Sequence, residues 1–159
     1  MDRDRIGEGA PAGNGDPGDP GGPGGGMPKR PMILRGATSQ EYWFEEGCHI
    51  TEWLNSPDDP GLSVARARVA PGVTTRLHRL VGVAERYVVL SGEGRVELVG
   101  ADSAMASADH YVSDIEPGDV VVIPPGVAQR VTNIGEQDLV FLALCTPRFT
   151  RAAYEDPGG

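Results

Sequence analysis

Residues 71–92, PGVTTRLHRLVGVAERYVVLSG, decide the fold of this chain. The stretch predicts two short strands with a turn at the glycine between them. His78 and Leu80 share a face of the first strand, because side chains alternate along a strand. Glu85 and Tyr87 share a face of the second strand for the same reason. If His78 faces the interior, Glu85 meets it there, and the two form either a costly buried pair or a metal site.

Short strands separated by turns continue along the chain. No convincing helix of ten or more residues is visible between residues 60 and 147. Short strands at regular spacing with turn signals predict an all-β barrel or sandwich. The expected elements are a strand in LSVARARV (62–69), a hairpin in ERYVVLSGEGRVELVG (85–100) joined at residues 91–94, a buried strand, turn and second strand in GDVVVIPPGVAQRVTN (118–133), and a final apolar strand in DLVFLALCT (138–146).

Composition divides the chain into a tail, one domain and a short C-terminal segment. Residues 1–31 are rich in Gly and Pro and poor in apolar side chains, so we expect them to be disordered. Residues 32–150 hold the barrel, and residues 151–159 predict one helical turn before the chain frays. Within the domain, residues 42–56 predict an edge strand or a short amphipathic segment over the end of the barrel. The polar stretch 99–112 predicts a hairpin loop or flap.

Charge and composition exclude several classes of function. The formal net charge is −9, and no basic cluster is present, so nucleic acid and anionic membranes are poor partners. No apolar run approaches a bilayer span, and the N-terminus lacks the apolar core of a signal peptide. Cys48 and Cys145 are isolated, which indicates neither a disulfide scaffold nor a zinc ribbon. Together these features predict a cytoplasmic protein with two reduced, partly buried thiols.

Residues 71–92 resemble the first motif of the cupin family, G-x5-H-x-H-x3-4-E-x6-G. Gly72, His78, Glu85 and Gly92 match the motif without gaps, and Leu80 stands at the second histidine.

The second motif of the family, G-x5-P-x-G-x2-H-x3-N, is similar to residues 118–133. Gly118, Pro124, Gly126 and Asn133 match it, and Gln129 stands at the histidine. The resemblance therefore covers roughly residues 66–146, and both departures fall on metal-ligand histidines of the family.

The resemblance implies a double-stranded β-helix (jelly-roll) barrel, often dimeric, with one divalent metal ion between its strands. The chain looks most like small single-domain cupins described as similar to mannose-6-phosphate isomerase. Carried over residue by residue, the metal ligands are His78, Glu85 and Gln129, because Leu80 has no donor atom. Such a nitrogen and oxygen site takes Mn, Fe, Ni, Co or Zn. The alternative is a metal-free, hydrogen-bonded cluster of the same residues that binds ligand directly.

Three further residue types are candidates for contact with a substrate. Tyr87 is a candidate catalytic acid or substrate contact, and otherwise an amphipathic wall residue. Arg68 and Arg76, with Arg66, lie on strands near the site, and an inward arginine suits a carboxylate or phosphate. The alternative is that these arginines lie on the outer face, as strand arginines usually do. Gln129 is a candidate substrate contact as well as a metal ligand.

The run of Val and Ile at residues 120–123 shows no alternation, which predicts a strand covered on both faces. Val88 and Leu90, opposite in phase to Glu85, indicate the same for their strand. Covering the outer face requires N-terminal chain or a second subunit, and we expect a homodimer through that sheet.

The leading hypothesis is a metal-dependent cupin enzyme, an isomerase, lyase or dioxygenase, acting on a polar small molecule. The main rival is a non-catalytic binding barrel, such as a sensor or carrier, without a tightly bound metal. A structural domain with a vestigial pocket is the third interpretation, because the fold alone does not choose a reaction.

Overall fold

The computed structural model describes residues 27–28, 30–100 and 110–158. It is almost entirely β-structure arranged as a jelly-roll barrel, as the sequence predicted. Two 3-10 turns, η1 (Gly36–Thr38) and η3 (Arg151–Ala153), flank the strands. Residues 1–26 and 101–109, which include most of the predicted tail and of the predicted flap, lie outside the described part of the chain.

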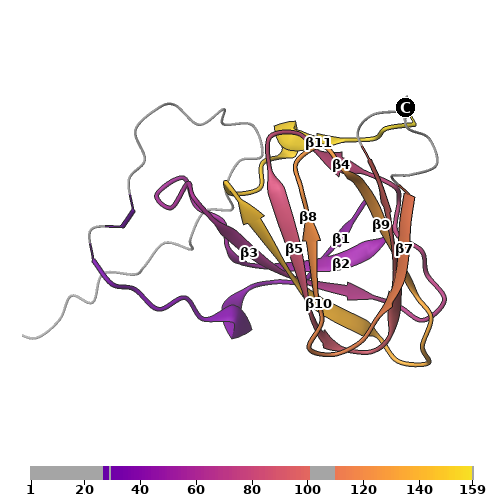
Figure 1. The fold of residues 1–159 in the computed structure, drawn as a ribbon. Helices are drawn as coiled ribbons and strands as arrows, with labels where there is room; N and C mark the ends of the chain where they lie inside the picture. Colours follow the sequence, from indigo (N-terminus) through magenta and orange to yellow (C-terminus); the bar gives the residue numbers. More distant parts are fainter. Residues whose placement is uncertain (1–26, 29, 101–109, 159) are drawn as a thin grey trace, which may run out of the picture.

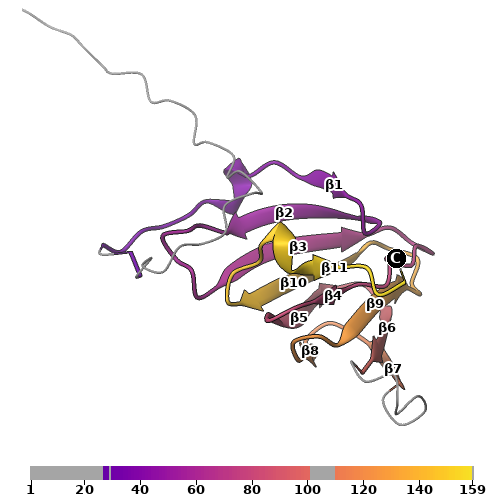
Figure 2. The same ribbon diagram turned by 90° about the horizontal axis from the view of Figure 1, so that it is seen from above.

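The larger sheet has six strands in the order β1-β2-β3-β10-β5-β8, all in antiparallel pairs. Figure 2 shows these strands following one another across the molecule. The edge hairpin of this sheet, β1 and β2, lies within the aromatic and acidic stretch 42–56. For this stretch the sequence predicted either an edge strand or a segment over the end of the barrel, and the structure shows the edge strand. The strands are β1 (Tyr42–Phe44), β2 (Cys48–Leu54), β3 (Ser63–Val69), β10 (Leu139–Thr146), β5 (Ala84–Ser91) and β8 (Val120–Ile123).

A three-stranded sheet in the order β7-β6-β9 faces the larger one, and a short pair, β4 with β11, lies at one end of the barrel (Figure 1). Strands β6 and β7 pair as a hairpin around the stretch predicted to be a loop. The strands are β6 (Gly94–Val99), β7 (His110–Ile115), β9 (Ala128–Asn133), β4 (Arg79–Leu80) and β11 (Tyr154–Glu155).

The core lies between the two sheets and consists mainly of branched aliphatic side chains. Burial alternates along β5, where Glu85, Tyr87 and Val89 face inward, as expected for a strand with one face on the core. The remaining core side chains come from both sheets and include Val69, Val96, Ile123, Val131, Leu139 and Phe141.

One predicted connection was wrong. Strands β5 and β6 do not pair with each other as a hairpin, because β5 belongs to the larger sheet and β6 to the smaller one. The turn between them carries the chain from one sheet to the other. Gly92 sits in this turn with φ +83°, and a Cβ atom there would lie 2.5 Å from the carbonyl oxygen of Asp138. Glycine is therefore required at the crossing for both conformation and space.

The prediction of a fully covered strand at β8 was also wrong for the single chain. β8 is an edge strand, and Val120 and Val122 are 56% and 61% exposed. Leu90 on the neighbouring strand β5 is 45% exposed. The outer apolar face of this part of the sheet is therefore open in the monomer.

The C-terminal segment contains the predicted helical turn, η3, but then continues as a strand instead of fraying. Strand β11 pairs with β4, and Arg79 forms two hydrogen bonds to Glu155. Arg76 forms an ion pair with Asp156 at 3.1 Å. These contacts attach the segment to the barrel beside His78. Among the described residues, no helix is long and apolar enough to cross a membrane.

Candidate functional site: a buried histidine–glutamine–glutamate cluster beside a pocket

His78 and Gln129 are brought together by the backbone. The two residues form an isolated antiparallel bridge, in which the amide of each donates to the carbonyl of the other, at 3.1 and 2.7 Å. Glu85 reaches the same place from strand β5 of the larger sheet. The structure therefore joins the three residues that the sequence predicted to converge, and all three are buried.

The side chains form a closed hydrogen-bonded cluster. His78 Nδ1 lies 2.9 Å from the carbonyl oxygen of Arg76, which only a protonated Nδ1 can satisfy. In the neutral ring Nε2 is then an acceptor, and Gln129 Nε2 lies 3.0 Å from it. The same amide nitrogen donates to Glu85 Oε2. Both amide protons of Gln129 are thus used, and its Oε1 is buried without a hydrogen-bond partner among the described residues.

Burial sets the protonation of the cluster. Burial raises the pKa of Glu85 to about 7, although hydrogen bonds from Gln129 and the Cys145 thiol offset part of this effect. Burial lowers the pKa of His78. Near neutral pH the imidazole is therefore uncharged, and the Glu85 carboxyl is poised between its two protonation states.

Glu46 is a fourth member of the site that the sequence did not reveal. Its Oε2 lies 3.7 Å from His78 Nε2. Burial, followed by the charges of Glu85 and Glu45, raises the pKa of Glu46 well above its usual value. Glu46 belongs to the turn between β1 and β2, which closes with a hydrogen bond from Gly47 N to the carbonyl of Phe44. No motif spacing distinguishes Glu46 from Glu45 in the sequence, so nothing marked it.

The C-terminal segment covers the other side of His78. The Tyr154 ring stacks on the imidazole with centroids 5.0 Å apart and an interplanar angle of 14°. Leu80, at the position of the family's second histidine, packs in an apolar cluster with Val83, Cys145 and Tyr154. The place of the absent ligand is thus filled by hydrophobic contacts.

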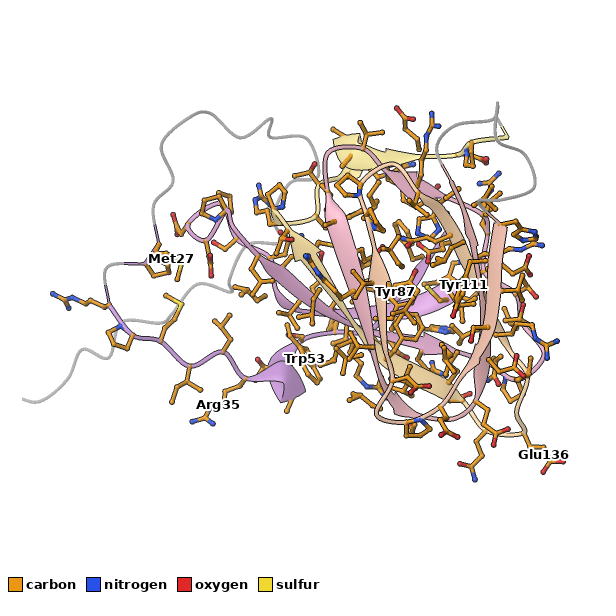
Figure 3. The ribbon with its side chains drawn as sticks, in the orientation of Figure 1. Met27, Arg35, Trp53, Tyr87, Tyr111 and Glu136 are labelled. Carbon is orange, nitrogen blue, oxygen red and sulfur yellow. The ribbon has the colours of Figure 1, made fainter. Side chains whose placement is uncertain are left out.

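A pocket with a cavity volume of about 70 Å³ lies on the inner face of the larger sheet beside this cluster. The acidic residues of its described lining are Glu46, Glu52 and Glu85, and five aromatic rings line its walls. Figure 3 places Tyr87 within the barrel, while Trp53 lies beside η1. The lining residues are Tyr42, Phe44, Glu46, Ile50, Glu52, Leu54, Asn55, Ser63, Ala65, Ala67, Glu85, Tyr87, Phe141, Ala143, Cys145 and Phe149.

The other predicted site residues divide between the pocket and the surface. Tyr87 lines the pocket, is 2% exposed, and packs on Phe141 with centroids 4.4 Å apart. Arg68 lies on the outer face of β3, where it pairs with Glu41 at 2.6 Å and with Asp138 at 3.2 Å. Arg76 is exposed and paired with Asp156. Neither arginine lines the pocket, so the structure does not bring them to a ligand there.

A divalent ion does not fit these side chains as they are arranged. The Gln129 amide group occupies the space between His78 Nε2 and Glu85, where an ion would have to lie. Within residues 27–28, 30–100 and 110–158, no three His, Cys, Asp or Glu side chains gather in a way that holds a metal. Binding of a metal ion therefore stays a prediction.

Comparison with known proteins identifies the family of the chain. Residues 45–151 match the family model described as Cupin. An uncharacterized protein of Methanocaldococcus jannaschii is 29% identical over 111 residues, covering 69% of this chain and 81% of that protein. An oxalate-binding protein of Thermotoga maritima is 34% identical over 80 residues, covering 50% of this chain and 58% of that protein.

Among solved structures, an oxalate decarboxylase of Bacillus subtilis, whose Mn(II) centres have been studied by EPR, superimposes with a TM-score of 0.61 at 24% identity. The match covers 74% of this chain and 30% of the decarboxylase chain. This likeness concerns the fold, and the chain spans less than a third of the length of that enzyme.

Proposed function

The chain belongs to the cupin family, and from this premise we propose that its barrel binds a small organic molecule in the pocket beside Glu85 and Tyr87. One observation carries the proposal: the pocket opens along the inner face of the larger sheet and ends at buried polar groups. Concave sites with mostly apolar walls and a few converging polar groups are typical of ligand-binding sites. This is the binding-barrel interpretation of the sequence.

The pocket follows from the choice of small side chains at neighbouring positions. On the paired strands β3 and β10, Ala65 lies opposite Ala143, and Ser63 lies opposite Cys145. All four side chains are small and line the pocket. Larger aliphatic residues at these inward positions would fill the space, as they do elsewhere in the core. The pocket therefore results from small side chains at paired positions of β3 and β10.

Glu85 and Tyr87 are the residues that would act on a bound molecule. The Glu85 carboxyl, with a pKa of about 7, is able to hold or release a proton near neutral pH. Gln129 fixes the orientation of that carboxyl. Burial raises the pKa of Tyr87 well above its usual value, so its hydroxyl stays protonated and serves as a hydrogen-bond donor. These properties suit orientation of a polar ligand, and they also permit proton transfer.

Filling the pocket tests the proposal. Ala65→Leu adds three carbons on the pocket wall, and Ala152→Leu makes the same change at an exposed position. Both variants and the parent protein are screened by thermal shift against organic cations, neutral molecules and anions. We expect hits that stabilise the parent and Ala152→Leu but not Ala65→Leu. Absence of any hit, or hits that Ala65→Leu retains, would overturn the proposal.

Binding of a divalent metal is the second candidate, favoured by the donor set. The hydrogen bond at His78 Nδ1 leaves Nε2 as an acceptor, Glu46 Oε2 lies 3.7 Å from it, and the Gln129 amide joins it to Glu85. A turn of the Gln129 amide would present its orphaned oxygen as a further donor. The relatives with Mn(II) centres support the general idea.

Measurement of the metal content tests this second candidate function directly. Tag-free protein purified without chelator is analysed by mass spectrometry together with His78→Ala and Glu85→Ala. Stoichiometric Mn, Fe, Ni, Co or Zn that both variants lose would support a metal-dependent enzyme. A metal-free protein that takes up no ion on incubation would leave the binding barrel as the function.

A further inference from the structure

The charged residues that line the pocket all carry the same sign. Glu46 and Glu85 lie deep in the pocket, and Glu52 is exposed at its mouth. No Lys, Arg or His belongs to the lining as the structure describes it. The arginines of strand β3 cannot compensate, because Arg66 and Arg68 point to the outer face and pair there with Glu41. The pocket thus has an acidic interior with no cationic partner on its own wall.

Aromatic rings form much of the remaining wall. Phe44, Tyr87, Phe141 and Phe149 line the pocket, and Tyr42 lies near its mouth. The face of an aromatic ring is negative, so a cation within about 6 Å of a ring centroid is attracted to it. Rings and carboxylates together therefore favour a positive charge and disfavour a negative one.

A third observation points to an absent ligand. Tyr87 is 2% exposed and lines the pocket, and its hydroxyl, which has no hydrogen-bond partner among the described residues, faces the open space of the pocket and not the closed core. A hydroxyl that faces a pocket is free to donate a hydrogen bond to a bound molecule. A molecule in the pocket with a polar group beside Tyr87 would supply that partner.

We propose that the pocket selects a small organic cation, an ammonium group attached to an apolar body, over neutral molecules and anions. The ammonium group lies between Glu46 and Glu85, where its positive charge favours the ionised form of both carboxyl groups. The apolar body packs on the rings of Phe141 and Phe149. Glu52 attracts the cation at the mouth. This inference rests on the proposed ligand-binding function and names the class of ligand.

Three probes of nearly equal size test the selection by charge. Benzylammonium, benzyl alcohol and benzoate share one ring and differ in the sign of the attached group. Isothermal titration at about pH 8 keeps the amine charged and favours ionised carboxylates. We expect benzylammonium to bind about tenfold or more tightly than benzyl alcohol, as a charge-assisted hydrogen bond allows, and benzoate not to bind.

Matched variants locate the cation. Glu46→Gln and Glu52→Gln each replace one carboxyl group of the pocket by a neutral amide, and Glu136→Gln makes the same change in an exposed loop far from Tyr87 (Figure 3). Both pocket variants should weaken benzylammonium about tenfold, the deeper one more, and leave benzyl alcohol unchanged. Glu136→Gln should change neither.

The outcomes separate the class of ligand from the function itself. Tighter binding of benzoate than of benzylammonium, abolished by Ala65→Leu, would overturn the cation inference while leaving the pocket as a ligand site. Unchanged benzylammonium affinity in Glu46→Gln and Glu52→Gln would overturn it as well. Failure of all three probes, together with an empty thermal-shift screen, would overturn the proposed function.

Discussion

Gln129 bridges two ionisable side chains of the barrel interior, His78 and Glu85. Its amide nitrogen lies 3.0 Å from His78 Nε2 and also donates to Glu85 Oε2. One neutral side chain thereby satisfies an imidazole acceptor and a carboxyl group that are both buried. Buried polar groups are stable only when they are paired, so the glutamine supports both neighbours at once.

Replacing Gln129 with leucine should lower the free energy of unfolding by about 2 kcal/mol or more. The substitution keeps the volume similar but leaves His78 and Glu85 without their shared partner, and each orphaned group costs about 1–3 kcal/mol. Urea unfolding followed by circular dichroism measures the change. Gln137→Leu, at an exposed position, is the control and should have little effect. Equal stability of the two variants would show that the bridge contributes nothing.

The double substitution Leu80→His and Gln129→His should create a stoichiometric site for a divalent ion. Both positions are buried beside His78, and the change restores the donors that the cupin motif places there. Metal content by mass spectrometry after incubation with Mn, Ni or Zn is the measurement, with the parent protein as reference. A folded double variant that gains no metal would contradict the expected convergence of these positions.

Stability in chelator should fall as the pH rises from about 6.5 to about 8. The pKa of Glu85 is about 7 in the folded protein against 4.5 for a free side chain, so the folded state binds the proton more tightly. Its contribution is complete below the unfolded pKa and is lost as the pH rises through the folded pKa. The raised pKa of Glu46 acts in the same direction, whereas the lowered pKa of His78 acts in the opposite direction below about pH 6.5.

Urea midpoints across this pH range measure the effect. Glu85→Gln, which stays neutral, should flatten the curve, whereas Glu136→Gln should keep the slope of the parent protein. Equal pH slopes for the parent protein and Glu85→Gln would refute the assignment of a proton to Glu85.

Val122→Asp should turn a homodimer into a monomer. Val120, Val122 and Leu90 form an exposed apolar face on strands β8 and β5, where a second subunit would bury them. Val112→Asp, at a valine 48% exposed on the other sheet, is the matched control and should stay dimeric. Light scattering at micromolar concentration gives the mass of each. A monomeric parent protein would refute the dimer.

The sequence predicted those parts of the structure that depend on local pattern. Alternation and turn residues predicted the strands, and the motif spacing predicted that His78, Glu85 and Gln129 converge. Pairing partners depend on contacts far apart in the chain, so the crossing of β5 to β6 between sheets looked like a hairpin. Both arrangements present the same pattern of Val, Leu and Gly.

Which side chains of a strand face the core also could not be predicted from the sequence. Arginines such as Arg68 alternate with alanines such as Ala67 along β3. Alternation alone does not show which of the two rows faces the core, because that depends on the side of the sheet on which the second sheet packs. The structure places the arginines outside because Glu41 and Asp138 pair with Arg68 there. Glu46 and Tyr154 reach the site from a turn and from the C-terminal segment, which no periodic pattern relates to His78.

Strand β10, the last long strand of the chain, lies between β3 and β5 in the larger sheet. During synthesis, β3 and β5 leave the ribosome well before residues 139–146. Until then, the edges of β3 and β5 that pair with β10 have no pairing partner. Unpaired strand edges with apolar faces are the surfaces through which nascent chains associate wrongly. The larger sheet therefore cannot be completed until residues 139–146 have been synthesised, because β10 supplies the pairing partner for both of these edges.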